Sequence, residues 1–223
     1  MPSSLIFRRV SLTLLWVGFI GYAFFLAPPD NPDTLSLIIN LSTGQWQGIN
    51  AYIISLFNAM GIWPMIYAAL LFADGRGQPL RAYPFVIGSF FLGAFALLPY
   101  LILRRPNPHF TGQLDWLLKM NESKILAVVL TLGAIACGVL ALKEGDWANF
   151  VEQWQNSRFL SVMSADFLCL SLLFGTVLGD DLARRGVENV KFWMILALIP
   201  LAGPLIYLLC RPSLQTERLG SQP

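Results

Sequence analysis

Residues 50–73 read NAYIISLFNAMGIWPMIYAALLFA and contain no charged side chain. An α-helix needs about 20 predominantly apolar residues to cross the hydrocarbon core of a bilayer. The stretch satisfies this requirement without interruption. It therefore predicts a membrane-crossing helix.

The whole chain has the same apolar character. Of its 223 residues, 56% are hydrophobic and 13% charged, against roughly 45–50% and 25% in a soluble domain. The net charge of +2 is too small for a polyanion-binding surface, so nucleic acid is excluded as a partner. The cysteines lie in or beside apolar stretches, with no short pairing motif, and predict no disulfide or zinc framework: Cys137, Cys169 and Cys210. The composition predicts a multi-pass protein of the lipid bilayer.

Six apolar runs predict an all-α transmembrane helical bundle of about six crossings. We expect one domain over 1–212 and a polar tail over 213–223. The predicted crossings are 10–27, 50–73, 83–103, 124–142, 159–179 and 190–210. Segments 114–120 and 147–155 predict short interfacial helices, and 33–47 is either interfacial or re-entrant.

The basic residues barely define an orientation for six crossings. With the amino terminus inside, eight lie inside and seven outside. The first loop has Asp30 and Asp33 but no basic residue, which favours an inside amino terminus. If the segment around Pro64 were re-entrant instead, the count would become nine against six.

Asp166 is the one charged residue well inside an apolar run. A charge in hydrocarbon costs at least about 2.5–3.5 kcal/mol on insertion scales, so Asp166 should face other helices or a wet cavity. It is either a proton-linked group or substrate ligand, or an interhelical hydrogen-bond acceptor that orients the fifth crossing. We expect the other charged side chains at the solvent or the interface.

The second crossing holds the other candidate functional residues. Pro64 cannot donate a hydrogen bond to Met60, so the helix is expected to bend or open beside Asn58 and Gly61. Tyr67 lies in the same crossing. Transporters build midplane sites from such helices. A plain kink, satisfied by neighbouring helices, is the alternative.

The loops contain no complete catalytic or metal-binding motif. Residues 180–186, DDLARRG, lack the second acidic half of a magnesium-diphosphate site. His109 is the single histidine, which excludes histidine-cluster metal centres. We expect no metal site and no evident cofactor, although a bound pigment or lipid fits such a bundle. The catalytic residues are unknown, and a non-enzymatic role is favoured.

Two resemblances to known families add to this interpretation. The first is carried by 57–67 (FNAMGIWPMIY), 74–77 (DGRG), 83–85 (YPF) and 93–100 (GAFALLPY), which resemble uncharacterised polytopic membrane proteins shared by cyanobacteria and chloroplasts. This resemblance implies a thylakoid or plasma membrane of a cyanobacterium, or a plastid membrane. It implies no established activity.

The second resemblance lies in the carboxy-terminal part. Asp166, Asp180 and 199–212 (IPLAGPLIYLLCRP) make this part similar to the plastid membrane family that includes a neoxanthin synthase factor. The chain lacks the Trp and His that this family carries just before its intramembrane Asp.

Three functions fit these observations. The favoured one is a non-enzymatic assembly, scaffold or stability factor of a photosynthetic membrane, with other membrane subunits as partners. The second is a small transporter or channel that uses Asp166 with Asn58 and Tyr67 around Pro64. The third is an enzyme acting on a lipid or carotenoid.

Overall fold

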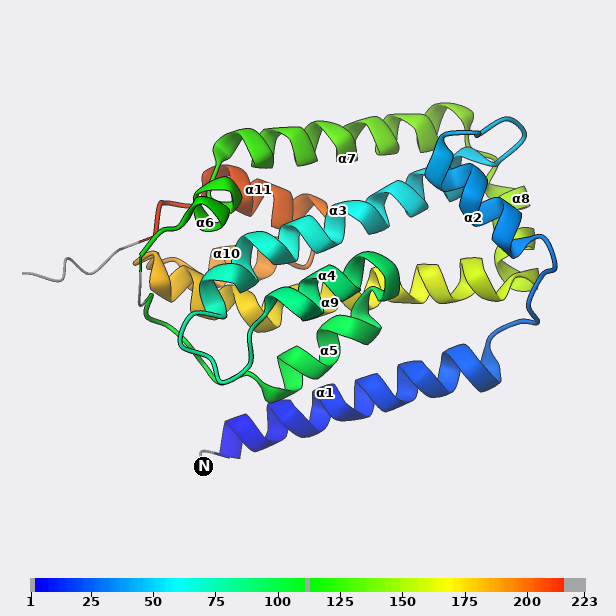
Figure 1. Ribbon diagram of the computed structural model, residues 1–223. Helices are drawn as coiled ribbons and strands as arrows, with labels where there is room; N and C mark the ends of the chain where they lie inside the picture. Colours follow the sequence, from blue (N-terminus) through cyan, green and yellow to red (C-terminus); the bar gives the residue numbers. More distant parts are fainter. Residues whose placement is uncertain (1–2, 111–112, 215–223) are drawn as a thin grey trace, which may run out of the picture.

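The computed structural model describes residues 3–110 and 113–214, with side chains from Leu5 onward. The predicted tail therefore lies outside the described residues from 215. Every regular element in these ranges is helical, which confirms the predicted all-α membrane bundle (Figure 1). The elements are α1 (Ser3–Gly21), the π-helical turn η1 (Tyr22–Leu26), α2 (Thr34–Thr43), α3 (Ala51–Asp74), α4 (Tyr83–Leu92), α5 (Ala94–Leu103), α6 (Trp116–Asn121), α7 (Lys124–Glu144), α8 (Trp147–Asn156), α9 (Arg158–Arg184), α10 (Val190–Leu196) and α11 (Ala202–Cys210).

Four helices are long and apolar enough to cross a bilayer: α3, α7, α9 and the continuous segment Leu5–Leu26 formed by α1 and η1. Helices α3 and α9 pack together in the interior, whereas α1 and α7 run along opposite outer sides of the bundle (Figure 1). Pro64 lies inside α3, which continues to Asp74. The alternative in which the segment around Pro64 is re-entrant is therefore wrong.

The predicted crossing at 83–103 is wrong, because Gly93 divides it into α4 and α5. Each helix has ten residues, which rise about 15 Å, half of the hydrocarbon core. Helix α4 begins beside Gly75, and Arg104 at the end of α5 donates a hydrogen bond to Asp74. Both ends of the pair therefore lie where α3 ends. Helices α4 and α5 form a re-entrant hairpin, which contacts α1, α3 and α9.

The predicted crossing at 190–210 is wrong for the same reason. A turn over 197–201 separates α10 from α11, and the chain reverses there. Arg185 before α10 donates a hydrogen bond to the carbonyl of Pro212 after α11, at 2.5 Å. This second re-entrant hairpin contacts α3, α7 and α9.

Local backbone chemistry explains both breaks. Gly93 has φ +50° and ψ −128°, a conformation essentially restricted to glycine. In the second hairpin, Leu201 has a positive φ of 60° and follows Pro200, which has no N–H to continue a helix. A Cβ at Gly203 would overlap the carbonyl of Leu196, so glycine is required where the two helices of this hairpin meet.

The hairpins collect the basic residues at one end of the bundle, here called the basic end. Of the described Lys and Arg residues, only Lys143 and Arg158 lie at the opposite end, here called the polar end. The twelve at the basic end are Arg8, Arg9, Arg76, Arg81, Arg104, Arg105, Lys119, Lys124, Arg184, Arg185, Lys191 and Arg211. The described basic residues therefore divide as twelve at one end and two at the other, whereas six crossings predicted eight inside and seven outside. The positive-inside rule therefore predicts that the basic end faces the cytoplasmic side.

The short helices lie at the two ends of the bundle. Helices α2 and α8 lie side by side at the polar end, and α6 lies at the basic end (Figure 1). Within 33–47, the structure has the ten-residue helix α2, which does not cross the bundle. The other two segments predicted to be interfacial contain α6 and α8.

Candidate functional site

Asp166 lies at the break in the first hairpin. Its Oδ1 accepts a hydrogen bond from the backbone N–H of Ala94, at 2.7 Å. Ala94 is the first residue of α5, so the carboxylate caps a helix amino terminus, where the helix dipole favours negative charge. Asp166 is 7% exposed and eight residues from the start of α9, about 12 Å along the helix axis.

Gly93 permits this contact because it has no side chain. A Cβ at Gly93 would overlap the Asp166 carboxylate. The second carboxylate oxygen, Oδ2, has no hydrogen-bond partner among the described residues. One oxygen therefore holds the hairpin tip, and the other is left to accept a proton or a hydrogen bond.

Polar contacts lie about one helical turn to either side of Asp166 on α9. Toward the basic end, the Tyr67 hydroxyl donates to the carbonyl of Leu170, at 2.7 Å. Toward the polar end, the Tyr22 hydroxyl and the Ser161 hydroxyl form a hydrogen bond. Tyr22, Asp166 and Tyr67 therefore link η1, the first hairpin and α3 to the same helix.

The structure does not bring the four predicted site residues into one cluster. Tyr67 contacts α9 close to Asp166, but the Asn58 side-chain amide donates to the carbonyl of Ile54 on its own helix, at 2.8 Å. Pro64 is buried within α3. Its neighbour Trp63 is fully buried and packs against Tyr67 and Phe167, with no hydrogen-bond partner for its indole N–H. A buried N–H without a partner is rare, and no sequence pattern singles out Trp63.

A polar cleft of about 690 Å³ opens at the polar end, between α2 and α8. Amide, hydroxyl and carboxylate side chains provide most of its lining: Asn31, Asp33, Thr34, Ser36, Asn40, Asn149, Glu152, Gln153, Asn156 and Ser157. The lining also includes Leu160, six residues before Asp166 on α9. Six residues correspond to about 9 Å along the helix axis.

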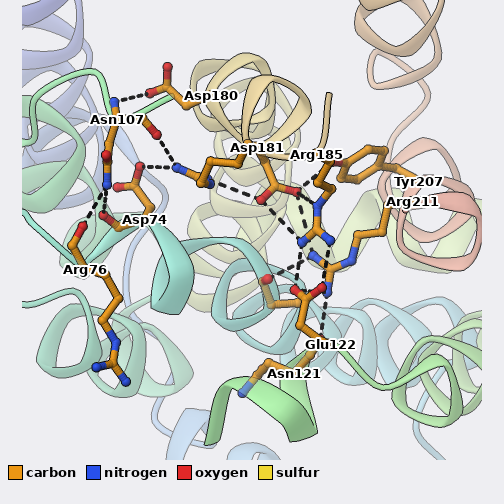
Figure 2. Close-up of polar contacts among 12 residues, drawn as sticks. Asp74, Arg76, Asn107, Asn121, Glu122, Asp180, Asp181, Arg185, Tyr207 and Arg211 are labelled. Atoms are coloured by element: carbon orange, nitrogen blue, oxygen red, sulfur yellow. Dashed lines mark hydrogen bonds and ion pairs between the residues drawn. The ribbon is translucent and has the colours of Figure 1, made fainter. Parts of the chain in front are cut away.

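A buried network of charges closes the basic end, and Figure 2 shows the part of it around Asp181 and Glu122. Four arginines and four carboxylates balance one another: Arg104, Arg184, Arg185 and Arg211 with Asp74, Asp180, Asp181 and Glu122. These residues come from α3, the ends of both hairpins, the α6–α7 connection and α9. We call them the charge cluster. It joins both re-entrant hairpins to the long helices.

Asp181 has the most partners in the charge cluster. Fully buried, it accepts hydrogen bonds from Arg184, Arg185 and Tyr207, with Arg211 at 3.8 Å. Burial alone would lower the pKa of Arg185, but its hydrogen bonds and charge interactions with Glu122 and Asp181 outweigh burial and raise that pKa. The guanidinium therefore stays charged in the interior.

The charge cluster corrects the expectation that charged residues other than Asp166 lie at the solvent or the interface. Asp74 and Asp181 are 0% exposed, and all four arginines are 4% exposed or less. In sequence these residues stand at the ends of apolar runs, as interfacial charges do. Pairing partners far apart in the chain make their burial possible, and no local pattern predicts it.

Comparisons with known proteins give one partial match. A segment is 34% identical over 85 residues to the MFS-type transporter ltbE of Aspergillus luteorubrus. The aligned part covers 35% of this chain, and the chain spans 15% of that transporter's length. No family model and no solved structure matches.

Polar groups lie at both ends of the bundle and in its interior. Hydrogen-bonding groups line an open cleft at one end, and the charge cluster closes the other end. Between them lie the buried indole N–H of Trp63 and Oδ2 of Asp166, neither of which has a hydrogen-bond partner among the described residues. In the described part of the chain, no three acidic, His or Cys side chains are grouped as a metal site would require.

Proposed function

We propose that the chain is a small membrane transporter in which Asp166 is the proton-linked group. The observation that carries the proposal is a carboxylate at the break of a half-length helix within the bundle. Non-helical backbone at membrane depth is tolerated where it is enclosed by protein or lines a cavity. Half-helix termini of this kind form the binding sites of many transporters. The partial match to a fungal transporter supports the same class.

Protonation of Asp166 would change the contact that holds the hairpin tip. The charged carboxylate interacts favourably with the amino terminus of α5, an effect worth about 0.3–2 kcal/mol. Neutralising it weakens the attraction to the Ala94 N–H and so loosens the contact between the tip and α9. A solute bound in the polar cleft would lie about 9 Å along α9 from Asp166, because Leu160 lines that cleft. Release at the basic end requires the charge cluster to open.

We expect Asp166→Asn to abolish proton-linked charge movement while the protein still folds. The asparagine oxygen can accept the Ala94 hydrogen bond, but it cannot take up a proton. Purified protein is reconstituted into vesicles, and the transient current is recorded after a step from neutral to mildly acidic pH. The current should fall by about tenfold or more, since an intramembrane carboxylate is the group expected to bind the proton.

Ser164→Ala is the matched control, because the Ser164 hydroxyl only donates to the Leu160 carbonyl on its own helix. This variant should keep the wild-type current. Equal currents in the wild type and Asp166→Asn would contradict the transport proposal.

The second candidate is an assembly, scaffold or stability factor of a photosynthetic membrane. It is supported by the outer helices α1 and α7. Only 17% and 11% of the residues in their most apolar stretches are buried, which leaves apolar faces that other subunits could cover. The resemblance to cyanobacterial and chloroplast proteins suggests this location. Absence of any wild-type current, together with a stoichiometric partner purified in mild detergent, would favour this candidate over transport.

A further inference from the structure

A second cavity lies at the basic end, separate from Asp166, the polar cleft and the charge cluster. Its volume is about 510 Å³, and it lies between the end of α3, the loop at 75–82, the start of α4 and helix α6. We call it the basic cavity. Both α3 and α4 meet the membrane surface here, so the cavity lies at headgroup level.

The lining of the basic cavity is amphipathic. Arg76, Gln78 and Arg81 provide hydrogen-bond donors, and Phe72, Tyr83 and Leu117 provide apolar surface. Tyr83 is 46% exposed, and the neighbouring Trp116 is 74% exposed. Exposed aromatic rings at a helix end are typical of the membrane interface.

The two arginines are available to an anionic ligand. Arg81 forms no ion pair with any described residue, and Arg76 pairs with Asp115. Side chains in that pair are 40% and 44% exposed, and exposed ion pairs contribute little stability. A phosphate oxygen could therefore displace Asp115 from Arg76 and also reach Arg81.

We propose that the basic cavity binds the phosphate group of an anionic phospholipid. Basic pockets between membrane helices on the cytoplasmic side are suited to anionic headgroups, and guanidinium groups bind phosphate through paired hydrogen bonds. The apolar wall favours a lipid, whose glycerol and first acyl carbons can lie against Phe72 and Leu117. The site is independent of the transport proposal.

The test measures retention of dioleoyl phosphatidylglycerol by the full-length protein in detergent, using native mass spectrometry. Dioleoyl phosphatidylcholine and inorganic phosphate are the competing probes. Arg76→Ala combined with Arg81→Ala should weaken retention of phosphatidylglycerol by about tenfold or more. The thermal unfolding midpoint should stay close to wild type, because neither arginine belongs to the buried charge cluster.

Two further variants make the test specific. Arg105→Ala removes an exposed arginine from the same end but outside the basic cavity, and should leave retention unchanged. Asp115→Asn keeps the side-chain oxygen that caps α6 and removes the competing charge, so retention should increase. Equal retention in the wild type and the double variant, or an equal loss in Arg105→Ala, overturns the proposal. If inorganic phosphate displaces the lipid from the wild type but not from the double variant, the phosphate contact is supported. If the protein binds inorganic phosphate but does not retain the lipid, the lipid assignment is overturned.

Discussion

Gly93→Ala is expected to destabilise the protein by about 3 kcal/mol or more. Two physical effects combine at this position. The backbone conformation, φ +50° and ψ −128°, is one that L side chains rarely adopt. The new methyl group would also overlap the Asp166 carboxylate and separate it from the N–H of Ala94. The hairpin tip cannot form as observed, so the thermal unfolding midpoint of the purified protein should fall sharply.

Gly61→Ala is the matched control for this substitution. Gly61 lies within α3, and a Cβ built there meets nothing within 4 Å. Alanine also has a higher helix propensity than glycine. This variant should be as stable as wild type or slightly more stable, measured by the same detergent-based thermal assay. Equal unfolding midpoints for Gly93→Ala and Gly61→Ala would contradict the conformation described for the hairpin tip.

Asp181→Asn is expected to cost about 3–5 kcal/mol, because removing one partner from a buried ion network leaves uncompensated charges. Three arginines surround this carboxylate, and both it and Arg184 are almost completely buried. Asparagine has nearly the same shape, so the loss would come from charge and hydrogen bonding rather than from a cavity. The unfolding midpoint and the yield of monodisperse protein measure the effect.

Asp115→Asn is the comparison for Asp181→Asn. It removes one charge from an exposed ion pair at the same end of the bundle, and exposed pairs contribute about 0–1 kcal/mol. Its stability should therefore stay close to wild type. If Asp181→Asn were equally mild, the charge cluster could not be what fastens the hairpins to the long helices.

The helical membrane fold could be predicted because a bilayer requires long apolar runs. Four of the six predicted runs are long continuous helices. The two errors, at 83–103 and 190–210, have one cause. Hydropathy detects the length of an apolar run. A hairpin of two half-length helices contains as many apolar residues as one helix that crosses the bilayer, so the two cannot be told apart in this way. The nearly even distribution of basic residues was a signal of this error. Six crossings place eight basic residues on one side and seven on the other, whereas two hairpins place twelve of the described basic residues at one end and two at the other.

The candidate site could be predicted only in part. Asp166 stands out in the sequence because a carboxylate in an apolar run is costly. Its contact with Ala94 depends on a break at Gly93 that is 73 residues away in the chain. Likewise, Asp74, Arg104, Asp181 and Arg211 all read as interfacial charges. Only the packing of helices distant in sequence shows that they are buried together.

Both hairpins enter and leave the membrane on one side, and cysteine accessibility tests this directly. The test replaces Cys137, Cys169 and Cys210 and then introduces single cysteines at exposed positions. Arg81 and Arg105 flank the first hairpin, and Lys191 in the first turn of α10 and Ser213 after α11 mark the two ends of the second. Asp30 and Lys143 mark the polar end. A membrane-impermeant maleimide is applied to sealed vesicles of known orientation.

If both hairpins are re-entrant, cysteines that replace Arg81, Arg105, Lys191 and Ser213 should all react from the cytoplasmic side. Cysteines at Asp30 and Lys143 should react only from the opposite side. Reaction of the Arg105 position from the side opposite to Arg81 would mean that 83–103 crosses the membrane, and would contradict the account.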